Sequence, residues 1–336
     1  MSIFISSLRN KLGCALVPTG MSFRLLLPIT LLAAVLVAPA AEAKYRVGIG
    51  EQTPSLFDQP RWQSLKLKRV RYIVPWDWNK SAAERAAVDA YMNRARAARQ
   101  DVLVTFTAHR GCFNGRRYSK RKACRAPSAS KYRKSFRAFD NRYTWVKTYS
   151  AWNEVNHVSQ PTANKPSLAV RYYEVLRKEA RKRRFRVMAA DILDISNMQS
   201  YLRGFLRRAK GHPRLWGLHN YQDTNRHTQA DTRLMLDTVP GEVWLTETGG
   251  IVRFAGVRKF AKYSEKRANT ATKWMFTLAN RYQTKRRGMR SKITQLFVYK
   301  WFGEPRGARF DAGLVNPNGK PRRQFKTFRK NALRHR

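Results

Sequence analysis

The sequence is poor in acidic residues. Only 21 of its 336 residues are Asp or Glu, against 68 Lys and Arg, which gives a formal net charge of +47. A field of that sign holds a protein near polyanions such as teichoic acids, acidic polysaccharides, anionic lipids or nucleic acids. The basic residues are spread along the chain, and neither a nucleic-acid-binding module nor a basic disordered arm is visible. No specific nucleic acid is therefore expected as a partner.

Linkers and phosphate-binding loops are lacking as well. No Gly-rich loop follows an apolar strand pattern, which argues against a nucleotide site. No Gly/Ser-rich or Pro-rich stretch divides residues 44–336, and this length suits one large domain. We therefore expect a single domain, and a monomer.

Cysteine is scarce, with three in the whole chain. Cys112 and Cys124 lie close together in a basic, loop-like stretch, and in an exported protein that arrangement favours a disulfide over free thiols. A zinc site would need further Cys or His residues at ligand spacing, and only His109 is near. Neither a metal nor another cofactor is expected.

Residues 1–43 are read as a signal peptide, with the start of the chain at Met1 or at Met21. The apolar run at 25–37 is too short and too interrupted by proline to make a good membrane span. Ala41-Glu42-Ala43 fits the small-x-small pattern that signal peptidase cleaves. The expected mature protein begins at Lys44 and is secreted, not integral to a membrane; a retained anchor is the alternative.

Residues 44–336 alternate between short apolar runs and longer amphipathic ones. The helical patterns cover 82–98, 168–184 and 268–281, and the runs read as buried parallel strands. This order predicts an α/β fold, a single (β/α)8 TIM barrel, with a doubly wound open sheet as the alternative. The eight expected strands are 45–49, 70–75, 102–107, 145–152, 186–190, 215–221, 243–246 and 294–301.

Two carboxylates close two of these strands. Glu154 ends the fourth and Glu247 ends the seventh. In a (β/α)8 barrel the active site lies at the carboxyl ends of the strands. Because the fourth and seventh strands are three positions apart, the two glutamates should face each other across the mouth of the barrel. A buried carboxylate is costly unless it is paired or used. A facing pair is the arrangement that glycoside hydrolysis requires.

The segments Trp152-Asn153-Glu154 and Thr246-Glu247 resemble the signature of the clan A glycoside hydrolases. This clan of retaining (β/α)8-barrel enzymes includes cellulase, β-mannanase, β-xylosidase and β-1,3-glucanase families. The resemblance implies that Glu154 is the general acid/base and Glu247 the nucleophile. Val155 stands where the clan has a proline, so the clan is assigned here without a family.

The resemblance extends to other strand ends and implies substrate-binding roles. Asn153 would bind the sugar 2-hydroxyl, and Arg71 on the second strand would keep the nucleophile ionised. His219 and Tyr221 match a His-x-Tyr pattern on the sixth strand, where the tyrosine orients the nucleophile. Trp301 matches the eighth-strand tryptophan that forms the floor under the reacting sugar.

The expected function is a secreted retaining glycosidase acting on a poly- or oligosaccharide. Trp76, after the second strand, is expected to stack on a sugar. The negative charge of Glu247 and an apolar wall should raise the pKa of Glu154, so that it holds its proton. A neutral glycan near an anionic cell wall is favoured over an acidic one, because no single basic cluster sits at a strand end.

Two other functions use parts of the same evidence. A catalytically inactive barrel could bind cell-wall glycan or another polyanion through its basic surface; both glutamates argue against it. A transglycosylase would use the same two glutamates, and the sequence does not separate it from a hydrolase.

Overall fold

The computed structural model describes residues 45–335. The expected signal peptide and its cleavage site lie outside this range. Within it, no helix has both the length and the apolar character needed to cross a membrane.

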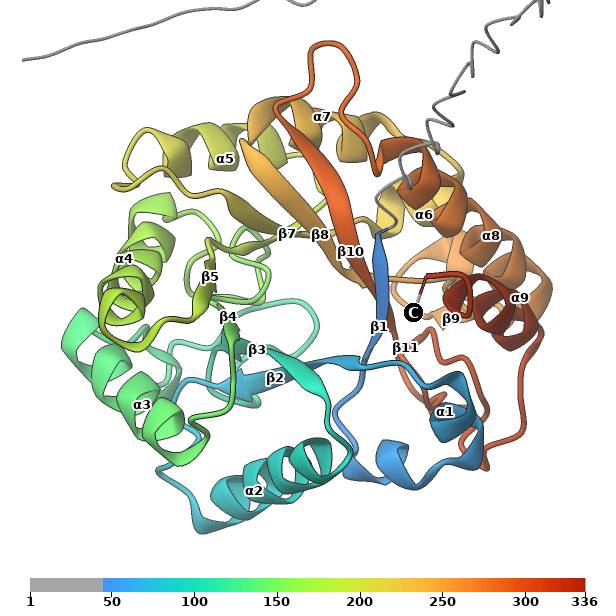
Figure 1. Cartoon of the computed structure of the whole chain (residues 1–336), viewed down its shortest axis with the longest axis horizontal. Helices are drawn as coiled ribbons and strands as arrows, with labels where there is room; N and C mark the ends of the chain where they lie inside the picture. Colours follow the sequence, from blue (N-terminus) through green and yellow to red (C-terminus); the bar gives the residue numbers. More distant parts are fainter. Residues whose placement is uncertain (1–44, 336) are drawn as a thin grey trace, which may run out of the picture. The chain divides into compact units, whose positions relative to one another are not determined.

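The described residues form a barrel of parallel strands (Figure 1). Each strand hydrogen-bonds its neighbours in the order β5-β4-β3-β2-β1-β10-β8-β7-β6, so the first and last long strands, β1 and β10, are paired. The strands are β1 Arg46–Gly50, β2 Arg69–Pro75, β3 Asp101–Thr107, β4 Thr148–Ser150, β5 Arg186–Met188, β6 Asp191–Leu193, β7 Leu215–His219, β8 Gly241–Thr248 and β10 Ser291–Tyr299.

The nine strands make an eight-fold barrel because β5 and β6 are two halves of the fifth position. β5 pairs with β4, and β6 pairs with β7. Between them, the amide of Ala189 donates to the carbonyl of Leu215, and the amide of Asp191 donates to the carbonyl of Trp152. The backbone therefore changes its pairing partner from β4 to β7 within a few residues, and the ring of strands closes at this position. The predicted (β/α)8 barrel is confirmed, and the open sheet is wrong.

Helices cover the outside of the barrel (Figure 1). Three of the longer ones begin at a serine cap: the side chains of Ser81, Ser128 and Ser264 each accept a hydrogen bond from a first-turn amide. The helices are α1 Pro60–Leu65, α2 Ala82–Ala97, α3 Ala129–Arg142, α4 Pro166–Arg183, α5 Met198–Leu206, α6 Tyr221–Arg226, α7 Ala230–Thr238, α8 Glu265–Tyr282 and α9 Arg323–Ala332.

Some predicted strand ends were wrong in ways that matter for the site. The run 215–221 ends as a strand at His219, because Tyr221 already begins α6. The run 294–301 ends at Tyr299. The run 145–152 is a strand only over Thr148–Ser150, and a turn follows it.

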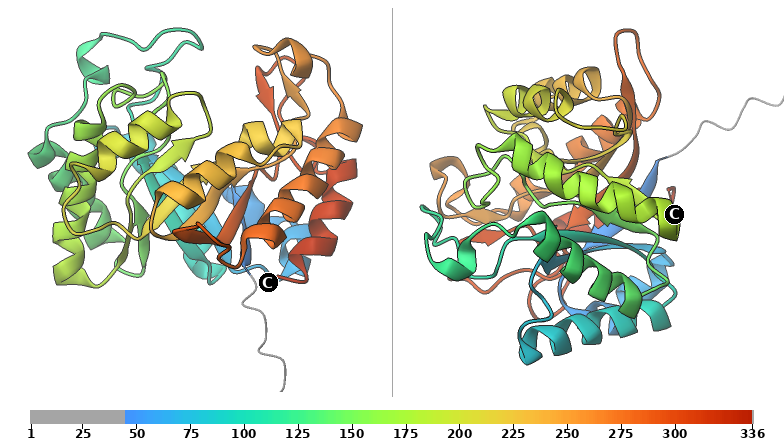
Figure 2. Two further views of the ribbon diagram at one scale, coloured as in Figure 1. Left: turned by 90° about the horizontal axis from the view of Figure 1, so that it is seen from above. Right: turned by 90° about the vertical axis from the view of Figure 1, so that its left-hand side faces the viewer.

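Two irregular segments project from the same end of the barrel (Figure 2). One is the loop 108–128 between β3 and α3, in which Cys112 and Cys124 form the expected disulfide, with their Cα atoms 5.5 Å apart. The other is a short antiparallel ribbon of β9 Arg253–Phe254 and β11 Phe310–Asp311. These segments stand over the carboxyl ends of the strands, where barrel enzymes hold their sites.

Candidate active site

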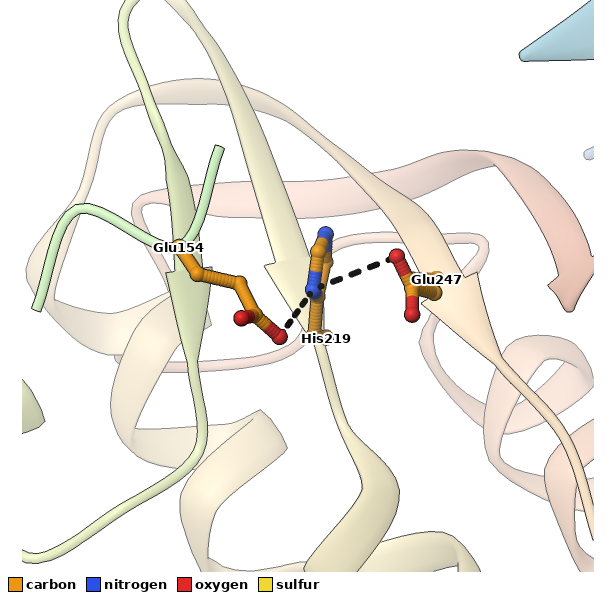
Figure 3. Close-up of side chains that lie close together, drawn as sticks. All are labelled: Glu154, His219 and Glu247. Carbon is orange, nitrogen blue, oxygen red and sulfur yellow. Dashed lines mark hydrogen bonds and ion pairs between the residues drawn. The ribbon is translucent and has the colours of Figure 1, made fainter. Parts of the chain in front are cut away.

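Glu154 and Glu247 line one cavity of about 820 Å³ at the carboxyl end of the barrel. Glu247 is the penultimate residue of β8 and is buried; Glu154 lies in the turn after β4 and is half-buried. One carboxylate oxygen of each glutamate and one nitrogen of His219 all lie within 4.8 Å of one another (Figure 3). The structure therefore brings together two of the predicted residues that lie far apart in the sequence.

The turn that carries Glu154 is held by backbone hydrogen bonds. Glu154 has a φ of 42°, a left-handed conformation that is costly for a residue with a Cβ and persists only where its surroundings fix it. The amide of Val155 donates to the carbonyl of Asp191 over 3.0 Å, and the amide of His157 donates to the carbonyl of Glu154 over 2.9 Å. Both bonds fix this conformation and so the position of the Glu154 side chain.

Arg71 is the buried cation under the site. Its side chain, on β2, is fully excluded from solvent. Nη1 donates to Oε2 of Glu247 over 2.9 Å; Nη2 donates to Oδ1 of Asn153 over 2.6 Å and to Oδ2 of Asp191 over 3.1 Å. A buried guanidinium is stable only with such partners. It ties together side chains from four barrel positions.

Asp191 was missed by the sequence analysis. It is fully buried at the start of β6, and it also accepts hydrogen bonds from Thr246 over 2.6 Å and Ser150 over 3.0 Å. Burial raises the pKa of its carboxyl, whereas the charge of Arg71 and the hydrogen bonds from Thr246 and Arg71 lower it, and the pKa lies below its usual value. The available signal was an Asp directly after an apolar run, together with an arginine predicted inside the barrel.

The contacts of His219 define its tautomer. Its Nε2 lies 3.3 Å from Nη2 of Arg71, and an arginine has only donors. Nε2 must therefore accept, and the neutral ring carries its proton on Nδ1. That proton points between the two glutamates, with Nδ1 3.2 Å from Oε1 of Glu154 and 3.7 Å from Oε2 of Glu247 (Figure 3).

The expectation of a raised pKa for Glu154 was wrong. Burial does raise the pKa of this carboxyl, but the hydrogen bond from His219, followed by the nearby His157 and Arg71, leaves the pKa below its usual value. A carboxylate that accepts a hydrogen bond is stabilised in its charged form. The free site thus favours the ionised form of Glu154, with His219 as its donor.

Tyr221 is the first residue of α6, and its hydroxyl donates to Oε1 of Glu247 over 3.2 Å. Burial and the neighbouring Glu247 both raise the pKa of the Tyr221 hydroxyl well above its usual value, so it acts as a donor. Glu247 thus accepts hydrogen bonds on both oxygens, one from Tyr221 and one from Arg71.

Trp301 and Trp76 do not line this cavity, contrary to their predicted roles. Trp301 is 1% exposed and packs edge-on against Trp62 and Phe325, with ring centroids 5.8 and 5.6 Å away. Trp76 is also buried. The aromatic residues that do line the cavity are Phe113, Tyr221, Phe254, Phe260, Tyr299 and Phe310.

The error at the eighth strand has a geometric cause. Side chains alternate only while the chain is a strand, and β10 ends at Tyr299. Tyr299 therefore faces the cavity, and Trp301, in the following bend, turns into the core. Of the sequence-predicted binding residues, the structure brings Asn153, Arg71, His219 and Tyr221 to the glutamates.

Glu154, His219 and Glu247 have the spacing of a possible metal site. The guanidinium of Arg71 already pairs with Glu247 and contacts the ring nitrogen of His219. A divalent ion would add positive charge beside this buried cation, which disfavours binding. The donor set therefore fits a metal poorly.

Comparison with solved structures finds the same barrel among enzymes that cleave glycans. An endo-1,4-beta-xylanase from Caldicellulosiruptor owensensis superposes with a TM-score of 0.58 at 12% identity, over 86% of this chain and 97% of its own. A structure of fungal beta-1,4-galactanases gives 0.55 at 14% identity, over 86% and 100%. At this identity the likeness shows the fold.

The sequence comparisons are more specific about family. No curated protein matches the sequence. Residues 126–328, more than half of the chain, match the family model described as glycosyl hydrolase catalytic core. This segment includes Glu154, Asp191, His219 and Glu247. The chain belongs to the glycosyl hydrolase catalytic core family, and it is a glycosidase.

Proposed function

We propose that the protein is a retaining glycoside hydrolase in which Glu247 is the nucleophile and Glu154 the general acid/base. The observation that carries the proposal is the separation of the two carboxylates. One carboxylate oxygen of Glu154 lies within 4.8 Å of one carboxylate oxygen of Glu247. Retaining enzymes hold their carboxyl groups about 5–5.5 Å apart, whereas inverting enzymes need about 6.5–9.5 Å to admit a water. The site has the shorter spacing.

The partners of each glutamate support this division of roles. Arg71 and Tyr221 each donate to Glu247 and hold it oriented, as a nucleophile requires. Glu154 is half-buried beside the cavity, with a single hydrogen bond from His219. It is the glutamate that can gain and lose a proton without breaking the arginine network.

The reaction then follows in two steps. An oxygen of Glu247 attacks the anomeric carbon, the glycosidic C–O bond breaks, and Glu154 gives its proton to the leaving oxygen. Glu154 next removes a proton from water, the water oxygen attacks the same carbon, and Glu247 leaves as a carboxylate. Asn153 accepts from Arg71 through Oδ1, so its amide nitrogen is left to donate to the sugar 2-hydroxyl.

Product analysis of two variants tests both roles. Glu154→Ala should lose about 10²–10⁴-fold in activity on substrates with poor leaving groups. Added azide should restore turnover as a glycosyl azide of retained configuration. Glu247→Ala with azide should give the inverted azide, since the small anion attacks from the face that the nucleophile occupied.

A matched control is Glu84→Gln, which removes a carboxylate that pairs with Arg110 away from the cavity. It should hydrolyse substrate like the parent. Azide products of swapped configuration, or full activity in either cavity variant, would exclude the proposed roles.

The proton of Glu154 gives a pH test. A general acid must be protonated, so the alkaline limb of kcat/KM follows the Glu154 pKa. The His219 hydrogen bond lowers that pKa. Replacing His219 by Phe removes the donor, raises the Glu154 pKa, and should move the alkaline limb to higher pH.

The control for this test is His157→Phe. His157 lies 3.7 Å from Glu154 and also lowers the pKa of that carboxyl, but it makes no hydrogen bond to it and contacts Ser159 instead. The His157 substitution should move the alkaline limb of the kcat/KM profile less than the His219 substitution does. An unchanged limb in His219→Phe would show that this bond does not set the protonation of the acid.

We also infer that the protein is exported and cleaved after Ala43. The disulfide between Cys112 and Cys124 supports export, because such bonds persist in oxidising compartments. Amino-terminal sequencing of protein from the culture medium should begin at Lys44. Full-length protein retained inside the cell would contradict export.

A further inference from the structure

Three arginines line the cavity that holds Glu154 and Glu247. They come from separate segments: Arg116 from the loop 108–128, Arg226 from the end of α6, and Arg309 from the residue before β11. All three are exposed, and within residues 45–335 none of them pairs with a carboxylate. The fold thus gathers at one opening positive charge that is scattered in the sequence.

Arg309 shows how closely this rim is assembled. Its guanidinium lies 5.8 Å above the ring of Phe254 in β9. It also lies directly beside Gly115, where an added Cβ would overlap it. The Arg309 side chain therefore reaches from the ribbon to the loop 108–128, where it lies against Gly115, the residue before Arg116.

The carboxylates lining the cavity have other partners and form no ion pair with these arginines. Glu247 is paired with Arg71, and Glu154 accepts from His219. Asp194 accepts from the amides of Gln222 and Asp223, and burial raises its pKa well above the usual value. The charge offered to a ligand at the rim is therefore positive.

The rest of the lining suits sugar rings. Phe113, Phe254 and Phe310 line the same cavity, and aromatic faces pack against the apolar faces of sugars. Guanidinium groups bind carboxylates and sulfates through paired N–H donors, which a neutral hydroxyl does not match. Rings on the walls and guanidinium groups on the rim fit a ligand that is both saccharide and anion.

We propose that the substrate is an anionic glycan whose carboxylate or sulfate groups bind Arg116, Arg226 and Arg309 at the mouth of the catalytic cavity. This inference rests on the proposed function, since it takes that cavity as the place of cleavage. It reverses the preference for a neutral glycan, which assumed that a basic cluster would appear within one segment of sequence.

The test uses polysaccharides in matched pairs: uronate polymers with their carboxyl-reduced forms, and sulfated polymers with their desulfated forms. For each pair, kcat/KM and Kd are measured for the mature chain. The expected result is a preference for one acidic form. The pair that shows it identifies the acidic group.

The key variant is Arg116→Gln/Arg226→Gln/Arg309→Gln. It should lower the ratio of kcat/KM for the acidic polymer to kcat/KM for its neutral form by about tenfold. Three exposed ion pairs that each contribute roughly twofold would give this loss. The triple Lys variant at these positions keeps the charge and should retain more of the preference. Circular dichroism checks that each variant is folded.

The control is Lys178→Gln/Arg181→Gln/Lys182→Gln on α4, which removes the same charge from an exposed surface outside the cavity lining. This variant should show the same acidic-to-neutral ratio of kcat/KM as the parent protein. Equal losses in both triple variants would overturn the proposal, because a diffuse field would then explain the preference.

The remaining outcomes separate this proposal from the proposed function. Hydrolysis of neutral forms as fast as acidic ones overturns the anionic substrate and leaves the hydrolase standing. If no polymer is cleaved, the proposed function fails, and Kd decides the inference: tighter binding of acidic forms that depends on the three arginines supports it, and binding independent of them overturns it.

Discussion

The site depends on the burial of Arg71. A guanidinium with no access to water must be matched by carboxylates, and breaking a buried pair costs about 3–5 kcal/mol. Arg71 meets this constraint with Glu247 and Asp191, and it also holds Asn153 and the ring of His219. The same contacts that compensate the charge therefore set the position of the nucleophile and the tautomer of the histidine beside the acid/base.

The fifth barrel position is shaped around the same constraint. The break between β5 and β6 brings Asp191 under Arg71, and the carbonyl of Asp191 holds the turn in which Glu154 lies. Glu154 and Glu247 are thus fixed relative to each other through one buried network and not through contact with each other. This fits a mechanism in which one carboxylate stays charged and the other exchanges a proton.

Much of the barrel could be predicted from the sequence, because buried parallel strands leave continuous apolar runs and helices leave their own period. The glutamates were found because each directly follows such a run. Asp191 was not found, since its partner Arg71 lies 120 positions away and only barrel closure brings them together. Trp301 was placed wrongly because alternation was extended past Tyr299, where the strand ends.

The cavity walls were beyond prediction for a similar reason. Phe254 and Phe310 lie on two short strands that pair with each other, and Arg309 contacts a loop almost 200 positions earlier. Neither segment carries a periodic pattern. Strand ends are readable from sequence; the loops that decide which glycan enters are defined by tertiary contacts.

The most direct test of the central claim is to trap the covalent intermediate. The mature chain would be incubated with activated 2-deoxy-2-fluoro glycosides of the sugar that it hydrolyses, digested, and mapped by mass spectrometry. The structure predicts one label, on the carboxylate of Glu247, the residue that Arg71 and Tyr221 hold. A label on Glu154, or turnover that never forms a covalent adduct and releases the inverted sugar, would contradict it.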